Sequence, residues 1–471
     1  MEITKQLGKN SDERQPVSAD TSQPPPGPKL PKLLNTLLVV LFERQAMSRI
    51  HRRYGDVFRI DMPVFGRSTF VSRPDLVKKV FQASPELLSY TDPSPLGRIL
   101  GPGSLFSMDG RQHLDERRLI LPAFHGERMR SYESIIEQEA LKEMANWPEG
   151  AEFPTLEPFM RITLNSILRC VFGAEGREID ELAAILPGFV TLGSRLTLLP
   201  ALQRDLGPGS PGRKFHRLRR SYDEVIDRMI TTALADPRLE ERDDVLSLLL
   251  RAHYDDGSYM SRTAVADELL TLLAAGHETT ATSLAWGVER LSRNPWVLQR
   301  LTREARDGDE NKFRMATIYE IQRSRPVISA TGRHTLRPFR IGDYTVPAGE
   351  HIVVLASMIH QDPRFFERPS EFQPDRFMEQ RPDGYTWIPF GGGTRRCPGA
   401  AFAHMEMDIV LRTLLRSFDL ATTESPAEGW RNRGIAFAPS RGGLAEFTRV
   451  NSEQHAEPLP VPAQQVLSTG G

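Results

Sequence analysis

A single cysteine lies in a glycine-rich loop near the C-terminus of this 471-residue chain. The loop runs from Phe390 to Gly399 and reads FGGGTRRCPG, which fits the pattern F-x-x-G-x-R-x-C-x-G. The thiolate is the metal-binding form of cysteine, and nearby cations and backbone N–H groups lower the pKa of the thiol. Here the glycines can aim N–H groups at the sulfur of Cys397, and Arg395 and Arg396 add positive charge. The pattern therefore indicates a metal ligand.

One cysteine is too few for zinc, which takes about four ligands. It can be the axial ligand of haem iron, because the porphyrin supplies the other four ligands. The second cysteine, Cys170, lies in an apolar stretch and is predicted to be a small buried core residue. Two cysteines in so long a chain do not make a disulfide framework, which favours a reducing, cytosolic setting.

A second group with possible chemistry lies inside a long apolar segment. Residues Thr263 to Leu291 are apolar on nearly every side, which predicts a helix buried at the centre of the protein. Within it the sequence AGHETT places Glu278 beside Thr279. A buried acid is costly unless it has a task or a partner. Gly276 can let the helix open, and a threonine hydroxyl can bond the helix backbone and distort the turn.

Charged residues recur in three further segments. Glu320 and Arg323 are spaced one helical turn apart, and Arg376 lies in the sequence PDRF. His113 and Arg117 share one helical face at i and i+4. Taken alone, such pairs are usually solvated ion pairs at the surface.

Taken in order along the chain, these motifs resemble those of the cytochrome P450 superfamily. The resemblance covers about residues 28 to 450 and implies a mainly α fold with a minor β part, the single-domain cytochrome P450 fold. It implies haem b, iron protoporphyrin IX, with Cys397 as the axial ligand of the iron. In the family, the counterparts of Glu320, Arg323 and Arg376 form a buried charge network near the cysteine loop.

The resemblance also assigns the residues that contact haem. Cations are expected to clamp the two propionates, and His113 stands where the family often has tryptophan. The assigned set is His113, Arg117, Arg333, Phe390, Arg395 and Gly399.

Glu278 and Thr279 match the family's oxygen-activation motif, which implies that the acid relays protons and that the hydroxyl holds water within hydrogen-bond reach. His277 is not expected to be a second axial ligand, because its neighbours fit the distal face. The implied activity is that of a haem-thiolate monooxygenase, an oxidoreductase that inserts one atom of dioxygen into a lipophilic small molecule. Two alternatives stay open: a peroxide-driven or peroxide-isomerising haem-thiolate enzyme, and a non-catalytic haem sensor or lipid carrier.

The chain resembles soluble actinobacterial members, among them the mycobacterial family numbered 138, which have no fused reductase. Electrons are therefore expected from a separate ferredoxin and ferredoxin reductase. The net charge of −1 gives no steering toward nucleic acid. The apolar run from Leu33 to Phe42 is shorter than the about 20 residues of a membrane span, so we expect no transmembrane anchor, with a weak peripheral membrane contact left open.

The elements that must position these residues can be outlined from patterning. Residues 1–28 are predicted to be a disordered arm, 29–450 the haem-thiolate domain and 451–471 a disordered tail. Alternation around Gly66 predicts a small hairpin, and a further β stretch is expected from Phe339 to Val354. Helices are expected from Leu33 to Tyr54 and from Ala400 to Arg416. Residues 90–107 and 206–213, rich in Gly, Pro and Ser, are expected to be loops beside the cavity.

Overall fold

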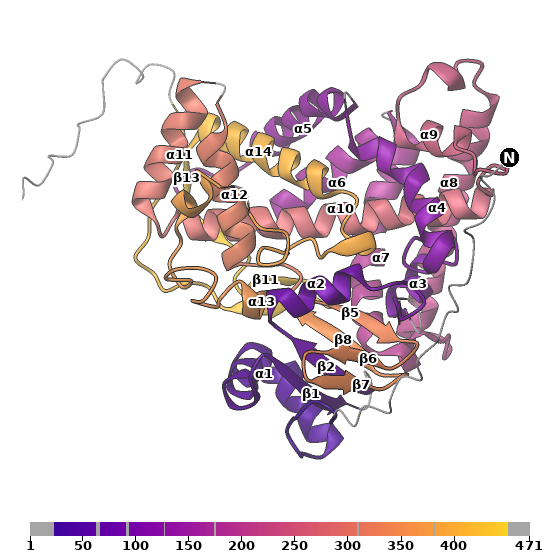
Figure 1. Ribbon diagram of the computed structural model, residues 1–471. Coiled ribbons are helices and arrows are strands. Elements are labelled where there is room, and N and C mark those ends of the chain that lie inside the picture. Colours follow the sequence, from indigo (N-terminus) through magenta and orange to yellow (C-terminus); the bar gives the residue numbers. More distant parts are fainter. Residues whose placement is uncertain are drawn as a thin grey trace, which may run out of the picture.

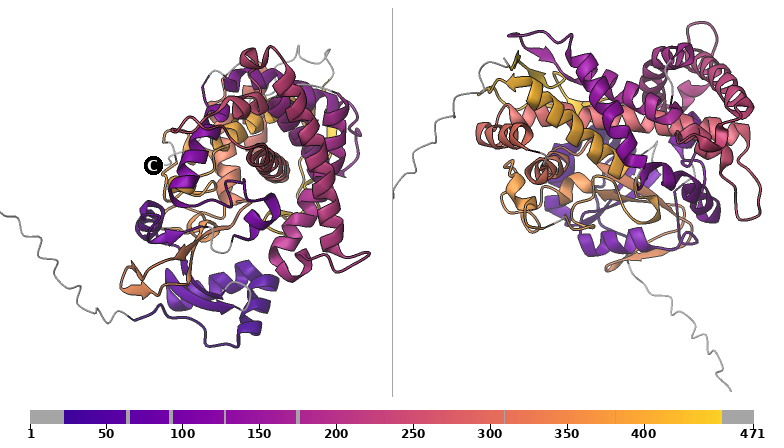
Figure 2. Two further views of the ribbon diagram at one scale, coloured as in Figure 1. Left: turned by 90° about the vertical axis from the view of Figure 1, so that its right-hand side faces the viewer. Right: turned by 90° about the horizontal axis from the view of Figure 1, so that it is seen from above.

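The computed structural model describes residues 23–450 apart from 63–65, 91–93, 127, 174–175, 309 and 381. Helices make up most of the molecule, and the largest sheet lies at one end (Figure 1; Figure 2, left). The described helices are α1 (Lys32–Tyr54), α2 (Pro74–Gln82), α3 (Pro95–Leu100), α4 (Gly110–Ile120), α5 (Arg128–Met144), α6 (Leu156–Phe172), α7 (Arg177–Leu198), α8 (Pro211–Ala235), α9 (Val245–Arg251), α10 (Arg262–Leu291), α11 (Pro295–Asp307), α12 (Lys312–Ser324), α13 (Ala356–Ile359) and α14 (Ala400–Ser417).

The largest sheet joins strands from two distant parts of the chain, residues 57–89 and 330–355. Its order is β1 (Val57–Met62), β2 (Gly66–Val71), β8 (His351–Leu355), β5 (Ala330–Thr335) and β3 (Leu88–Ser89). β1 and β2 form the predicted hairpin, and β2 runs parallel to β8. Four antiparallel pairs complete the described strands: β6 (Phe339–Ile341) with β7 (Tyr344–Val346), β4 (Phe153–Pro154) with β12 (Leu444–Ala445), β9 (Phe418–Leu420) with β13 (Phe447–Arg449), and β10 (Trp430–Asn432) with β11 (Phe437–Pro439).

Helix α10 crosses the centre of the helical part, as its apolar sequence predicts (Figure 1). The side chains of Leu269, Leu270 and Leu273 are fully buried, and α6 and α14 pack against the helix. The hydroxyl of Ser261 caps its first turn by accepting the N–H of Ala264. Among the described residues, no helix combines the length and the apolar character needed to cross a bilayer.

The structure differs from the expected loops at two points. Helix α3 lies inside the 90–107 segment, and α8 begins at Pro211 rather than after Arg213. In both cases a serine stands before a proline: Ser94 accepts the N–H of Gly97, and Ser210 accepts that of Arg213. A serine cap followed by proline in the first turn is a helix-start signal that the Gly/Pro-rich composition obscured.

The predicted terminal arms lie mostly outside the described residues, which begin at 23 and end at 450. Of the residues assigned to the N-terminal arm, 23–28 are described, and the carbonyl of Pro26 accepts the N–H of Arg59 in β1 at 2.7 Å.

The three residues of the expected charge network are brought together. Arg323 donates to Glu320 through Nε at 2.7 Å and Nη2 at 2.8 Å, and both side chains are fully buried. Arg376 lies 3.1 Å from the same carboxylate. Arg323 Nη1 also donates to the carbonyl of His360 at 2.6 Å. The network therefore ties α12 to the segment that precedes the cysteine loop.

We expect Arg323→Met to lower the free energy of unfolding by about 3–5 kcal/mol, because it leaves the buried Glu320 carboxylate without its main cation. Urea unfolding measures this loss. The control is Arg303→Met, since Arg303 is an exposed residue of α11. Equal effects of the two substitutions would contradict a structural role for the network.

Candidate functional site

The cysteine loop wraps its backbone around the Cys397 sulfur. The N–H of Cys397 donates to the carbonyl of Phe390 at 3.0 Å, and the N–H of Gly399 donates to the sulfur. Gly391 and Gly393 adopt φ values of +66° and +67°, which favour glycine. Helix α14 begins directly after Gly399 and fixes the end of the loop.

Two glycines also allow the loop to dock on α2. A Cβ atom on Gly392 would overlap the ring of Phe81, and one on Gly393 would overlap the Phe81 carbonyl oxygen. On the other flank, the half-buried ring of Phe390 meets His404 of α14 edge-on, with 5.0 Å between ring centroids. The loop is thus held by α2 on one side and by α14 on the other.

Cys397 is a free cysteine with an accessible side chain, whereas Cys170 is free and buried, as predicted. Surrounding protein nevertheless raises the pKa of the Cys397 thiol, and the Gly399 N–H with Arg117 and Arg396 oppose that rise. Both observations fit a sulfur that faces an internal space. Because burial favours the thiol, a bound metal cation is what would hold the thiolate.

Arg333 of β5 is a buried cation whose contacts are neutral. Its side chain is 7% exposed, and it donates to the carbonyls of Gly332 at 2.8 Å and Gly392 at 3.3 Å. It lies over the rings of Phe81 and Tyr90 and touches no carboxylate in the described part of the chain. Burial lowers its pKa to about 10. Burying an unpaired cation costs free energy, so this site favours a bound anion.

Arg117 and His113 project from α4. Burial lowers the pKa of Arg117, although the nearby Cys397 opposes this, and no ion pair of Arg117 is seen within the described residues. Burial, with the positive charges of Arg395 and Arg117, lowers the pKa of His113 to about 3. His113 is therefore neutral at pH 7 and can donate a hydrogen bond to an anion, but it adds no charge.

Arg395 has a carboxylate partner, unlike Arg117 and Arg333. Its Nη2 donates to Asp109 Oδ1 at 2.6 Å and to the Met108 carbonyl at 2.5 Å. Asp109 is buried in part, but hydrogen bonds from Ser89, the Tyr90 N–H and Arg395 lower its pKa to about 2. Asp109 was missed by the sequence reasoning, although its place before Gly110 at the start of α4 is a capping signal.

His113, Arg333 and Arg395 line one cavity, together with Phe81, Tyr90 and Asp109. Arg117 and Arg333 lack a protein counter-charge among the described residues, and the two propionates of haem would supply it. The iron would take the Cys397 sulfur. The residues present therefore fit haem.

Helix α10 has an accessible strip in its otherwise buried middle. Ala275 is exposed and Thr279, one turn later, is half-buried, whereas His277 and Glu278 are buried. The Thr279 hydroxyl donates to the carbonyl of Ala275 at 2.9 Å. The His277 ring is bonded to the Leu273 carbonyl through Nδ1, at 3.1 Å. The strip thus leaves a methyl group and a hydroxyl accessible in the middle of the helix.

Glu278 is bound by a residue that the sequence reasoning missed. Arg433, in the turn between β10 and β11, donates from Nε to Glu278 Oε1 at 2.9 Å. The two residues are 155 positions apart in the sequence, so no local pattern connects them.

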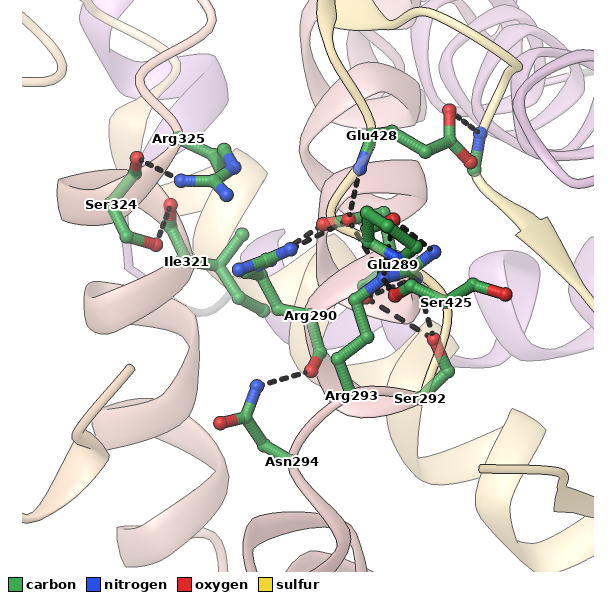
Figure 3. A network of polar contacts seen from close by, with 12 residues as sticks. Glu289, Arg290, Ser292, Arg293, Asn294, Ile321, Ser324, Arg325, Ser425 and Glu428 are labelled. Atoms are coloured by element: carbon green, nitrogen blue, oxygen red, sulfur yellow. Dashed lines mark hydrogen bonds and ion pairs between the residues drawn. The ribbon is translucent and has the colours of Figure 1, made fainter. Parts of the chain in front are cut away.

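A polar network fastens this hairpin to the end of α10 (Figure 3). Glu289 is fully buried, pairs with Arg290 and accepts the backbone N–H of Glu428 at 2.9 Å. The Glu428 carboxylate accepts the N–H groups of Arg441 and Leu444. One helical turn before Glu289, the Trp286 Nε1–H donates to the Phe437 carbonyl at 2.9 Å. The C-terminal hairpin is therefore fixed along α10.

Comparison with known proteins gives consistent matches. A family model described as cytochrome P450 matches residues 24–443. The chain is 49% identical over 426 residues to "Putative cytochrome P450 138" of Mycobacterium tuberculosis, covering 90% of this chain and 96% of that protein. It is 37% identical over 405 residues to "Putative cytochrome P450 137" of the same organism, covering 85% of each.

Among solved structures, the fold resembles that of "Retinoic acid bound cyanobacterial CYP120A1". The TM-score is 0.79 at 21% identity, and the match covers 91% of this chain and 99% of that chain. At this identity the likeness concerns the fold.

We expect Gly393→Ala to lower the free energy of unfolding by about 2–4 kcal/mol, because the methyl group meets the Phe81 backbone and the residue keeps a left-handed conformation. Urea unfolding and the haem content per chain measure the effect, and both should fall. Gly384→Ala is the control, since its Cβ would meet nothing within 4 Å. A fully stable, haem-replete Gly393→Ala protein would contradict this account of the loop.

Proposed function

Because the chain belongs to the cytochrome P450 family, we propose that it is a haem b monooxygenase that inserts one atom of dioxygen into a lipophilic small molecule. The observation behind this proposal is the free Cys397 thiol, held by the Gly399 N–H and placed near Arg117. When bound, the haem supplies the site at which dioxygen is bound and reduced.

Different residues of the chain are proposed to bind different parts of the cofactor. Cys397 would hold the iron through its sulfur, and Phe390 and Gly399 shape the loop around that sulfur. Arg117 and Arg333 neutralise the propionates, and His113 donates a hydrogen bond to them. Arg395, paired with Asp109, adds a donor whose charge is already compensated. Glu320, Arg323 and Arg376 hold the segment before the cysteine loop.

Glu278 and Thr279 are assigned to proton delivery. Oε1 of Glu278 is bonded to Arg433, whereas Oε2 has no hydrogen-bond partner in the described parts of the chain. That second oxygen can accept a proton from water and release it. The Thr279 hydroxyl lies on the accessible strip of α10 and can hold the water molecule that receives the proton.

The proposed electron donor is a separate ferredoxin with its reductase, in a cytosolic setting. Arg396 supports this proposal, because it is exposed and directly precedes Cys397. Arg111 and Arg118 are weaker candidates for docking, since both are within ion-pair distance of Asp115 and Asp255. The apolar Ala275 on the accessible strip supports a lipophilic substrate. A library screen for compounds that shift the spin state of the haem would identify the class.

The thiolate ligand can be tested directly. We expect the dithionite-reduced protein with carbon monoxide to show the Soret band of a thiolate-ligated haem, and Cys397→Ala to lose it, because no other thiol in the described chain is accessible. Cys170→Ala is the matched control and should keep the band. A band at the neutral-histidine position in the parent protein would refute the proposed function.

Thr279→Ala should raise the hydrogen peroxide released per NADPH consumed by about tenfold, because the hydroxyl that holds the proton-delivering water is gone. Thr279→Ser, which keeps the hydroxyl, should behave like the parent. The assay uses a plant-type ferredoxin, its reductase and the compound with the largest spin-state shift. Unchanged peroxide release would count against the role of Thr279, and turnover with peroxide but never with ferredoxin would favour the peroxide-driven alternative.

A further inference from the structure

The cation that pairs with the buried Glu278 carboxylate comes from outside α10. The side chain of Glu278 is 4% exposed, and Arg433 Nε lies 2.9 Å from Oε1. His277, its neighbour in α10, is buried, and burial lowers the pKa of that ring. In the described part of the chain, Arg433 is therefore the cation that offsets the cost of burying this carboxylate.

Arg433 also contacts the first turns of α6. Its Nη1 lies 3.7 Å from Glu157 Oε1, and its Nη2 is 3.8 Å from the sulfur of Met160. Glu157 is 62% exposed, so solvent screens its attraction for the guanidinium. The buried partner, Glu278, is closer and less screened. Arg433 is thus anchored at the surface by α6 and bonded in the interior to α10.

The turn that presents Arg433 has little freedom to move. The Arg433 N–H donates to the Ala436 carbonyl at 2.9 Å, which closes the turn. Gly434 has φ +116°, and a Cβ there would come within 2.6 Å of Ser194 in α7. At the other end of the hairpin, Trp430 packs on Trp286 with ring centroids 4.7 Å apart. The guanidinium is therefore delivered to Glu278 from a fixed backbone.

We propose that Arg433 is a positioning residue for Glu278: it holds Oε1 and leaves Oε2 available for proton transfer. This inference rests on the proposed role of Glu278. Because Arg433 contacts the carboxylate through Nε alone, one oxygen is used for orientation while the other keeps its capacity to accept a proton. A bidentate contact would occupy both oxygens.

The ion pair is tested on the haem-loaded protein without turnover, by urea unfolding of Arg433→Met, Glu278→Gln and the double variant. We expect each single substitution to lower the unfolding midpoint and the double variant to lower it by less than the sum of the two. Additive losses would overturn the proposal. Arg431→Met is the control, because Arg431 is exposed on the same hairpin, and it should combine additively with Glu278→Gln.

The positioning role is tested by measuring how much hydrogen peroxide is released per NADPH consumed, that is, how tightly NADPH oxidation is coupled to product formation. The assay uses the ferredoxin system and the compound selected by its spin-state shift. Arg433→Met should raise peroxide release per NADPH by about tenfold with KM for the compound unchanged. Arg433→Lys should recover most of the coupling, and Glu157→Gln should resemble the parent. Normal coupling in Arg433→Met would overturn the inference, provided that Glu278→Gln uncouples. If Glu278→Gln is itself fully coupled, the proposed function of the acid fails instead.

Discussion

Positive charge buried without a protein counter-charge is the constraint on which the rest of the site depends. Arg333 touches neutral oxygens and aromatic rings, and the nearby Asp109 is already paired with Arg395. Leaving such a cation unpaired costs several kcal/mol. Burial likewise favours the protonated thiol of Cys397. A ligand with a metal cation and carboxylates would offset both the unpaired charge of Arg333 and the cost of ionising the Cys397 thiol. Binding of the cofactor and stability of the fold are therefore linked.

Helix α10 fixes the relative positions of the accessible strip, Glu278 and the C-terminal hairpin. Its middle turns leave Ala275 exposed and Thr279 half-buried. Its last turns hold the C-terminal hairpin through Trp286 and through Glu289 (Figure 3). Because a helix rises 1.5 Å per residue, the hairpin anchor and Glu278 stand at a fixed separation. The accessible strip, the acid and the base of the hairpin therefore behave as one rigid unit.

The sequence predicted the type of fold and the order of the motifs well, because both depend on local patterns. The long apolar run marked α10, and alternation around Gly66 marked the β1–β2 hairpin. Contacts between distant segments were not predictable: nothing near Glu278 points to Arg433. The shift in the pKa of His113 was not predictable either, because it depends on burial and on Arg395, which lies far from His113 in the sequence.

The parallel pairing of β2 with β8 has a consequence for how the chain reaches this fold. Ser68 is paired with His351 and Val71 with Val354, so the central strands of the sheet lie about 280 positions apart in the chain. During synthesis, β1 and β2 emerge long before their partner, and one edge of β2 stays open until β8 has left the ribosome. An open edge can pair with another chain. The helical majority thus gains its sheet only late in translation, and the nascent chain is exposed to aggregation for most of that time.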